Sequence, residues 1–214
     1  MDALRESLAA VQERRETFAA FTFERALAAR LTDAAVEEAL LLGLPLAQGI
    51  MRRIVRSRGQ EMRLTVRVKY REGVRMLEAM RESTTPLNAR EQQALRMAQG
   101  IAAEALLRQD EAERFQYVFD WIVRHIRYAH IAPGRQGYER LVGASGALLD
   151  RQANCQGFAD ALYLLCGLCG IACEYRIGHG KRLLHVWNAV CIGHTWKETD
   201  ASRESRRIRM DADI

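Results

Sequence analysis

The chain has 214 residues, of which 49% are apolar and 28% are charged, and its formal net charge is +5. This length suits one sizeable domain with an appendage, and the composition is typical of a soluble globular protein. Because no run of about 18 apolar residues occurs, we expect no membrane-spanning helix and no membrane partner. The arginines are scattered among acidic residues, so only the net charge favours nucleic-acid binding, and we do not expect nucleic acid as a partner.

Residues 1–58 are predicted to form helices only. Apolar residues recur there at helical spacing, and no cluster of chemically active residue types is present. The first helix carries the stripe Leu4, Leu8, Val11 and Phe18, a second helix begins at Asp33 and runs to Leu42, and residues 46–56 form a third. We therefore expect a helical appendage over 1–58, whose helices are also the expected surface for a homo-oligomer.

Residues 59–214 are predicted to form a separate domain of mixed helices and strands. The segment 61–70 (EMRLTVRVKY) alternates between apolar and polar side chains, which indicates a strand with one buried face and one basic, solvent-exposed face. Further along the chain, helices are predicted over 72–81, 88–108 and 111–127, and a partly helical stretch over 138–150.

A helix is predicted to follow Asn154, and its first turn holds a cysteine. Asn154 is a good N-cap residue, no proline interrupts the following residues, and Gly170 is suited to end the helix. Cys155 would then lie where free backbone N–H groups and the helix dipole stabilise a thiolate. Three β-like runs follow, over 171–178, 183–191 and 195–199.

His185 lies in the second of these runs, and Asp200 directly follows the third. If the intervening turn is centred on Ile192 and Gly193, His185 opposes Asp200 across an antiparallel pair, and both side chains point to the same face. A thiol, an imidazole and a carboxylate can form an activated nucleophile, its base and the group that orients the base. We therefore predict a catalytic triad of Cys155, His185 and Asp200.

These residues resemble the transglutaminase-like superfamily of papain-type cysteine enzymes, and in particular its bacterial members. The matching positions are Cys155, Gly157, Ala159, Gly170, Ile171, His185, Trp187, Asn188, Trp196 and Asp200, with Asp120, Trp121 and Tyr128 upstream. The resemblance covers about 110–202, with Ala153 where many members carry glycine. It implies an α+β fold in which the cysteine-bearing helix packs on an antiparallel sheet.

The resemblance also implies an activity, which is acyl transfer or hydrolysis at an amide through a thioester. The amide would be a protein glutamine or a peptide bond, so we expect a protein or peptide substrate and no cofactor. The backbone N–H of Cys155 is expected in the oxyanion hole, and weaker candidates for oxyanion or substrate contacts are Gln152, Tyr138, Trp187 and His179. The alternative hypothesis is a non-catalytic protein-interaction module on the same fold.

The cysteines also raise the question of a metal site. Cys166, Cys169 and Cys173 have a spacing seen in zinc sites, but the first two fall inside the predicted helix, where cysteine behaves as a small apolar residue. We therefore expect no metal. The lack of a disulfide-like pattern and the charged N-terminal stretch favour a cytoplasmic location, and secretion stays open if a leader has been trimmed.

Overall fold

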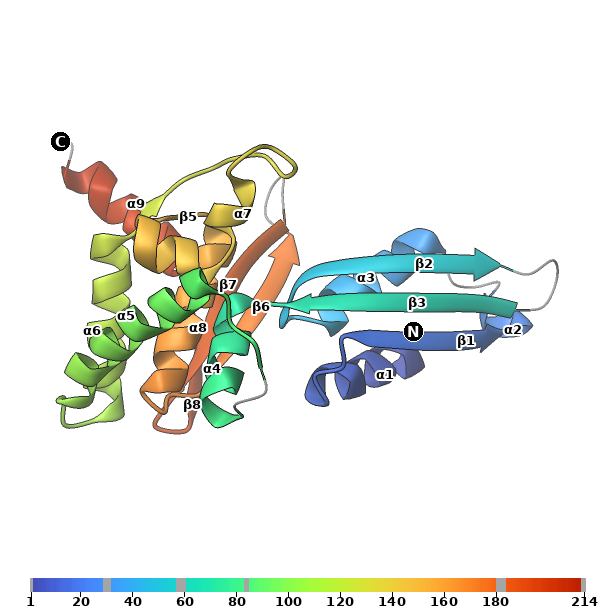
Figure 1. Ribbon diagram of the computed structural model, residues 1–214, viewed down its shortest axis with the longest axis horizontal. Helices are drawn as coiled ribbons and strands as arrows, with labels where there is room; N and C mark the ends of the chain where they lie inside the picture. The colour runs from blue at the N-terminus through green and yellow to red at the C-terminus, as the bar shows by residue number, and fades with distance from the viewer. Residues whose placement is uncertain (1, 29–31, 57–60, 83–84, 180–183, 213–214) are drawn as a thin grey trace. The chain divides into compact units, whose positions relative to one another are not determined.

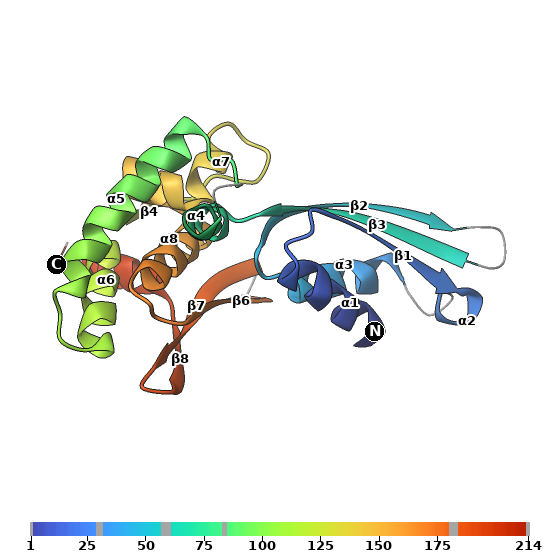
Figure 2. The same cartoon turned by 60° about the horizontal axis from the view of Figure 1, so that its bottom comes forward.

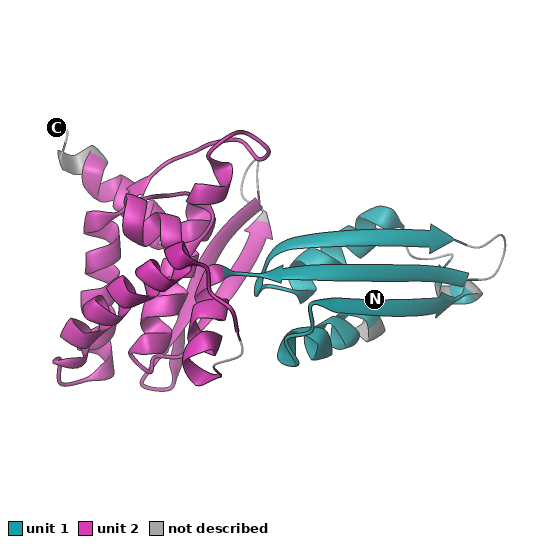
Figure 3. Cartoon of the chain, viewed as in Figure 1, with its two compact units in different colours: residues 1–71 teal, residues 72–214 magenta. Residues whose placement is uncertain are grey.

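The computed structural model describes residues 2–28, 32–56, 61–82, 85–179 and 184–212. The chain divides into two compact units, residues 1–71 and residues 72–214 (Figure 3). Both units combine helices with antiparallel sheets, so the fold is of the mixed α and β class (Figure 1). Within the described residues, no helix has both the length and the apolar composition that a membrane crossing requires.

The N-terminal unit is a three-stranded antiparallel sheet with two helices on one face (Figure 2). Its strand order is β1-β3-β2, and α1 and α3 cover the inner face. The elements are α1 (Asp2–Glu13), β1 (Phe18–Glu24), α2 (Arg25–Ala28), α3 (Asp33–Gly43), β2 (Ala47–Arg56) and β3 (Glu61–Tyr70). The predicted alternation of β3 is confirmed, because its even-numbered residues are buried against the helices.

The prediction that residues 1–58 contain only helices is wrong, because β1 and β2 are strands. Both pair with β3, so the strand that we assigned to the second domain is the centre of the first sheet, and the unit boundary follows Arg71. Phe18, which we counted in a helical stripe, begins β1. The alternation of β2 is hidden because arginines occur on both of its faces, as at Arg52 and Arg53.

The C-terminal unit packs helices around a second antiparallel sheet of order β6-β7-β8. A short parallel pair, β4 and β5, precedes this sheet in the sequence. The elements are α4 (Glu72–Arg81), α5 (Ala89–Leu106), α6 (Glu111–His125), β4 (Arg127–Tyr128), α7 (Tyr138–Leu141), the π-helical turn η1 (Gly146–Asp150), β5 (Gln152–Ala153), α8 (Cys155–Leu168), β6 (Cys173–His179), β7 (Leu184–Ile192), β8 (Thr195–Thr199) and α9 (Ala201–Ala212). The predicted cysteine-bearing helix on an antiparallel sheet is confirmed.

Helix α8 begins and ends where the sequence predicts. The side chain of Asn154 accepts hydrogen bonds from the backbone N–H groups of Gln156 (2.9 Å) and Gly157 (3.3 Å), which is the N-cap arrangement. At the other end Gly170 has a φ of +73°, a left-handed conformation that glycine adopts without strain. Cys155 is therefore held in the first turn of the helix.

Two buried polar side chains fix α8 on the sheet. Asn188 of β7 donates from Nδ2 to the backbone oxygen of Ala159 at 3.2 Å. Asp160 is fully buried and accepts a hydrogen bond of 2.6 Å from the hydroxyl of Tyr175 on β6. The carboxyl group of Asp160 also accepts from the backbone N–H of Gly73 and of Ala144, so α4 and the loop before η1 are tied to the same helix.

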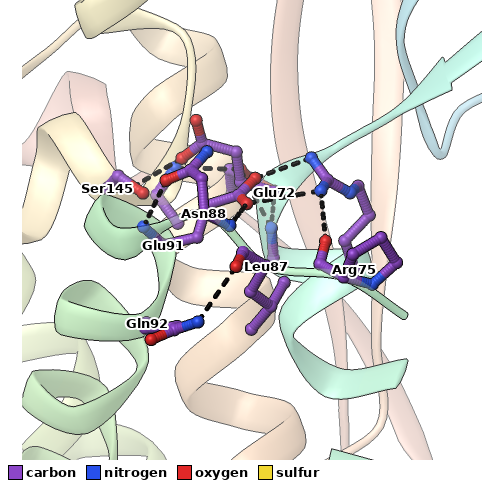
Figure 4. A network of polar contacts seen from close by, with 11 residues as sticks. Glu72, Arg75, Leu87, Asn88, Glu91, Gln92 and Ser145 are labelled. Atoms are coloured by element: carbon purple, nitrogen blue, oxygen red, sulfur yellow. Dashed lines mark hydrogen bonds and ion pairs between the residues drawn. The ribbon is translucent and has the colours of Figure 1, made fainter. Parts of the chain in front are cut away.

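A second polar network joins α4, α5 and that loop (Figure 4). Glu91 is only 2% exposed and forms an ion pair of 2.6 Å with Arg75, while Asn88 and Glu91 form a capping box at the start of α5. Glu72 accepts a hydrogen bond of 2.8 Å from the backbone N–H of Ser145. The loop that precedes the cysteine helix is therefore held at several points.

Gly157 is required by a close approach between α8 and the preceding loop. A Cβ atom at this position would lie 2.4 Å from the backbone oxygen of Leu141, far inside van der Waals contact. That same oxygen accepts a hydrogen bond from the backbone N–H of Asn154 at 3.0 Å. The absence of a side chain at Gly157 thus lets the loop cap the start of the helix.

We predict opposite stability changes for two glycine-to-alanine substitutions in helices. Gly157→Ala should destabilise the protein by about 1–3 kcal/mol, because the backbone of Leu141 cannot move aside cheaply. Gly100→Ala in α5 has no atom within 4 Å of the added Cβ and should stabilise it by about 0.5–1 kcal/mol. Urea denaturation of both variants measures the two changes, and shifts of the same sign would contradict the packing argument.

Candidate active site

Three separate elements bring Cys155, His185 and Asp200 together. Cys155 opens α8, His185 lies near the start of β7, and Asp200 stands between β8 and α9. His185 Nε2 and Asp200 Oδ2 are 2.7 Å apart, and the imidazole lies beside the Cys155 thiol, close enough to lower the pKa of that thiol. The side chains of His185 and Asp200 are 23% and 16% exposed, so the pair is largely shielded from water.

The predicted register of β7 and β8 is wrong by two residues. Asn188 opposes Thr199, because the turn is centred on Gly193 and His194 rather than on Ile192 and Gly193. Both turn residues have positive φ, 55° and 67°, as a two-residue type I′ hairpin requires.

The two-residue shift leaves Asp200 on the same face as His185. Asp200 becomes a diagonal neighbour of the imidazole, and diagonal neighbours are still within reach of long side chains. Trp187 and Glu198 have the same diagonal relation, and the indole Nε1 donates to Glu198 Oε2 at 3.2 Å. The predicted contact between His185 and Asp200 is therefore present although the predicted register is wrong, because a shift by an even number of residues keeps a side chain on the same face of the sheet.

Asp200 is also the N-cap of α9, a helix that the sequence analysis did not identify. Its Oδ1 accepts from the backbone N–H of Arg203 at 3.0 Å and from the hydroxyl of Ser202 at 2.7 Å. Oδ2 is thereby left facing His185. The signal was an aspartate directly before a proline-free run rich in helix-forming residues.

Electrostatic interactions favour a charged pair at the centre of the site. The hydrogen bond with Asp200, followed by that with Cys155, raises the pKa of His185 to about 9. Burial alone would raise the pKa of the Cys155 thiol, but hydrogen bonds from His185 and from the backbone N–H of Val186 lower it below its ordinary value. Burial likewise opposes ionisation of Asp200, yet hydrogen bonds from His185 and Ser202 lower its pKa to about 2.

Tyr128 is a further polar group beside the cysteine. Burial and the proximity of Cys155 raise the pKa of its phenol, so the hydroxyl keeps its proton throughout the neutral range. The guanidinium of Arg206 lies 4.3 Å from the ring centroid. Tyr128 fits the family pattern but is not among the predicted site residues, because a single tyrosine in a sequence does not disclose that it faces a distant cysteine.

A cavity of about 620 Å³ opens beside the imidazole. The ring of Trp187 stacks on that of His185 with centroids 5.6 Å apart. The lining residues are Phe119, His185, Trp187, Glu198, Thr199, Asp200, Arg203 and Glu204. Carboxylates are therefore the commonest charged groups around this cavity.

The weaker candidates are placed differently. Trp187 lies in the site, and the hydroxyl of Tyr138 accepts a hydrogen bond of 3.1 Å from Gln156 in the first turn of α8. Gln152 is exposed on β5, and the structure brings it to no triad residue among those described. His179 pairs through its backbone with Leu184, and its side chain lies outside the described residues.

Two buried cysteines differ from Cys155 in the direction of their pKa shifts. Burial raises the pKa of the Cys169 thiol, and the proximity of Cys173, together with burial, raises that of Cys166. Within the described parts of the chain, no group of three or more histidine, cysteine, aspartate or glutamate side chains is arranged to hold a metal ion.

Residues 96–201 match the family model of the transglutaminase-like superfamily. A human relative, kyphoscoliosis peptidase, is 26% identical over 104 residues, which are 43% of this chain and 16% of that protein. The chain thus spans about a sixth of the length of this relative.

Several solved structures are similar to this chain at low identity. A transglutaminase structure has a TM-score of 0.44 at 11% identity, covering 80% of this chain and 48% of its own. A candidate cysteine protease of Cytophaga hutchinsonii has a TM-score of 0.42 at 15% identity, covering 88% and 67%. A candidate protease of Parabacteroides distasonis has a TM-score of 0.43 at 12% identity, covering 72% and 36%.

We predict that Cys155 is the most reactive of the five thiols toward iodoacetamide at pH 6. Its lowered pKa gives it more thiolate at this pH than ordinary cysteines have, whose pKa is about 8.5. Peptide mass spectrometry of briefly alkylated native protein measures each site. Cys191 is a matched comparison, since it is also half-buried but lies at the opposite end of β7 from His185. Equal labelling of Cys155 and Cys191 would contradict the assignment.

Proposed function

We propose that this protein is a cysteine enzyme of the transglutaminase-like superfamily, whose family model residues 96–201 match, and that it acts on amides through a thioester at Cys155. The observation that carries the proposal is the hydrogen bond of 2.7 Å between His185 and Asp200, with the Cys155 thiol beside the same imidazole. A lowered thiol pKa beside a raised imidazole pKa is what a thiolate–imidazolium pair requires. The substrate that we propose is a protein or peptide.

In the first step the Cys155 thiolate attacks the carbonyl carbon of a carboxamide or peptide bond. A C–S bond forms, and the carbonyl oxygen becomes an oxyanion. The backbone N–H of Cys155, at the start of α8, is the first donor proposed for this oxygen, and the protonated hydroxyl of Tyr128 is a second. The first donor belongs to Cys155 itself, and the second lies close enough to Cys155 for the thiol to raise its pKa.

In the second step the tetrahedral intermediate collapses to a thioester. The C–N bond breaks, and the imidazolium of His185 gives its proton to the departing amine. Asp200 holds the ring in place and stabilises its charged form. The neutral imidazole then accepts a proton from the water or amine that attacks the thioester, and the Cys155 thiolate is restored.

The cavity beside His185 is suited to the amine side of the reaction. It faces the ring that exchanges protons with the amine, and its three carboxylates, those of Glu198, Asp200 and Glu204, outnumber by one its two cations, Arg203 and the His185 imidazolium. The indole of Trp187 also borders it, and aromatic faces attract cations. This cavity can therefore receive an amine as leaving group or as acceptor.

Whether water or an amine resolves the thioester depends on access, because both routes use the same three residues. We propose an amide hydrolase or acyltransferase without choosing between the two. The free state of all five cysteines suits a reducing compartment, so a cytoplasmic location is part of the proposal. A non-catalytic interaction module on the same fold is the competing function, and an inert Cys155 would favour it.

We expect mass spectrometry to detect a covalent acyl-enzyme at Cys155. Incubation with peptides that present either a glutamine side chain or only backbone amides should give an adduct on the protein, and an added primary amine should shorten its lifetime if transfer occurs. Cys155→Ala should lose the adduct and lower turnover by about four orders of magnitude or more. Cys191→Ala is the matched control and should keep both. Turnover that survives Cys155→Ala would refute the proposed chemistry.

We also expect activity to fall on the alkaline side near pH 9. The active ion pair needs a protonated His185, whose pKa is raised to about 9, so kcat/KM should decline as the pH passes that value. Asp200→Asn removes the strongest cause of the raised pKa and should move this decline to lower pH while reducing the rate. Glu198→Gln, in the same cavity, should leave the decline near pH 9. An unmoved alkaline limb in Asp200→Asn would show that another group titrates there.

A further inference from the structure

The N-terminal sheet has an outer face that α1 and α3 do not cover (Figure 2). We call it the open face and define it by Phe18 of β1, Arg63 and Arg67 of β3, and Met51, Arg53 and Val55 of β2. The alternation of the strands places these side chains on the side opposite the buried residues of β3.

The arginines of the open face differ from those of the inner face. Arg52 and Arg56 point to the helix side, and each forms an ion pair of 2.9 Å with a carboxylate of α3, Glu37 and Asp33 respectively. Their sequence neighbour Arg53, on the opposite face, forms no ion pair with any described residue.

The same is true of the other two arginines of the open face, Arg63 and Arg67, among the residues that the structure describes. The whole unit is basic, with 13 arginines and lysines against nine acidic residues in 1–71. The acids of α1 and α3 lie on the helix side. The same alternation places Glu24, Glu61 and Lys69 on the side of the open face, which with them carries four basic and two acidic side chains and so stays basic.

Large apolar side chains stand between these charges. Phe18 is 53% exposed, Met51 is 69% exposed and Val55 is 46% exposed. They form cross-strand rows with the arginines, since Arg67 lies between Phe18 and Met51, and Arg63 is the direct partner of Val55. A contiguous surface of exposed apolar residues with charges interspersed is typical of an interaction site.

The composition of the open face decides which partner it suits. Arginines without an ion-pair partner among the described residues attract carboxylates, which they bind with two donors each, and Met51 and Val55 need an apolar counterpart. Single-stranded nucleic acid would need several aromatic rings for base stacking, and Phe18 is the sole aromatic residue in the defined face. A second copy of the same face would bring like charges together.

We propose that the open face is a docking surface for a protein segment that alternates acidic and apolar residues. An extended segment lying along the strands would present its side chains at the spacing at which arginines and apolar residues alternate here. The acidic groups would pair with Arg53, Arg63 and Arg67, while the apolar groups would cover Phe18, Met51 and Val55.

Binding of labelled peptides to the full chain tests this proposal by fluorescence anisotropy. A peptide of alternating glutamate and leucine should bind, and peptides with serine in place of leucine or lysine in place of glutamate should bind more weakly. The triple variant Arg53→Gln, Arg63→Gln, Arg67→Gln should weaken the first peptide about tenfold, since each exposed ion pair contributes modestly. Met51→Thr with Val55→Thr keeps residues that favour strands and should also weaken it.

The matched control neutralises three arginines that lie elsewhere on the surface, Arg5→Gln, Arg96→Gln and Arg135→Gln. It changes the net charge equally and should leave peptide binding at the wild-type level. Equal weakening by the two triple variants would overturn the proposal, because attraction would then follow net charge alone. Tighter binding of a single-stranded RNA of equal charge would overturn it in favour of a nucleic-acid surface. Thermal unfolding of each variant confirms that the sheet is intact.

Discussion

The buried carboxyl group of Asp160 is the constraint on which the candidate site depends. It accepts hydrogen bonds from the backbone N–H groups of Gly73 and Ala144 and from the hydroxyl of Tyr175. These donors belong to α4, to the loop before η1 and to β6, so three segments far apart in the sequence converge on one residue of α8. Because a buried polar group without a partner is costly, the helix cannot rotate or slide without a penalty at each of them.

This fixed helix explains why Cys155 and His185 meet without any direct link in the sequence. Asn188 ties the second turn of α8 to β7, the strand that carries His185 three residues earlier. The sulfur then lies near the backbone N–H of Val186 and the imidazole, and Asp200 completes the arrangement from the start of α9. Asp200 stabilises the charged form of His185, and His185 in turn stabilises the thiolate of Cys155. The half-buried thiol therefore keeps a lowered pKa although burial alone would raise it.

Local patterns in the sequence predicted much of this arrangement. The helix at Cys155 was predictable because a side-chain cap and a C-terminal glycine act over a few residues, and β3 because its alternation is complete. β1 and β2 were not predicted, since both are edge strands and β2 carries arginines on both faces. Local periodicity is a weak signal wherever burial on one face comes from packing partners that are distant in the sequence.

The sequence by itself determined which residues are candidates for the chemistry, because a thiol at a helix start, an imidazole in a strand and a carboxylate after the next strand are local features. Only the tertiary structure decided how they meet. The hairpin turns at Gly193 and His194, so Asp200 reaches His185 diagonally, and it does so while capping a helix that the sequence analysis missed. Turn position and helix docking depend on contacts between residues far apart in the chain, and those contacts leave no periodic trace in the sequence.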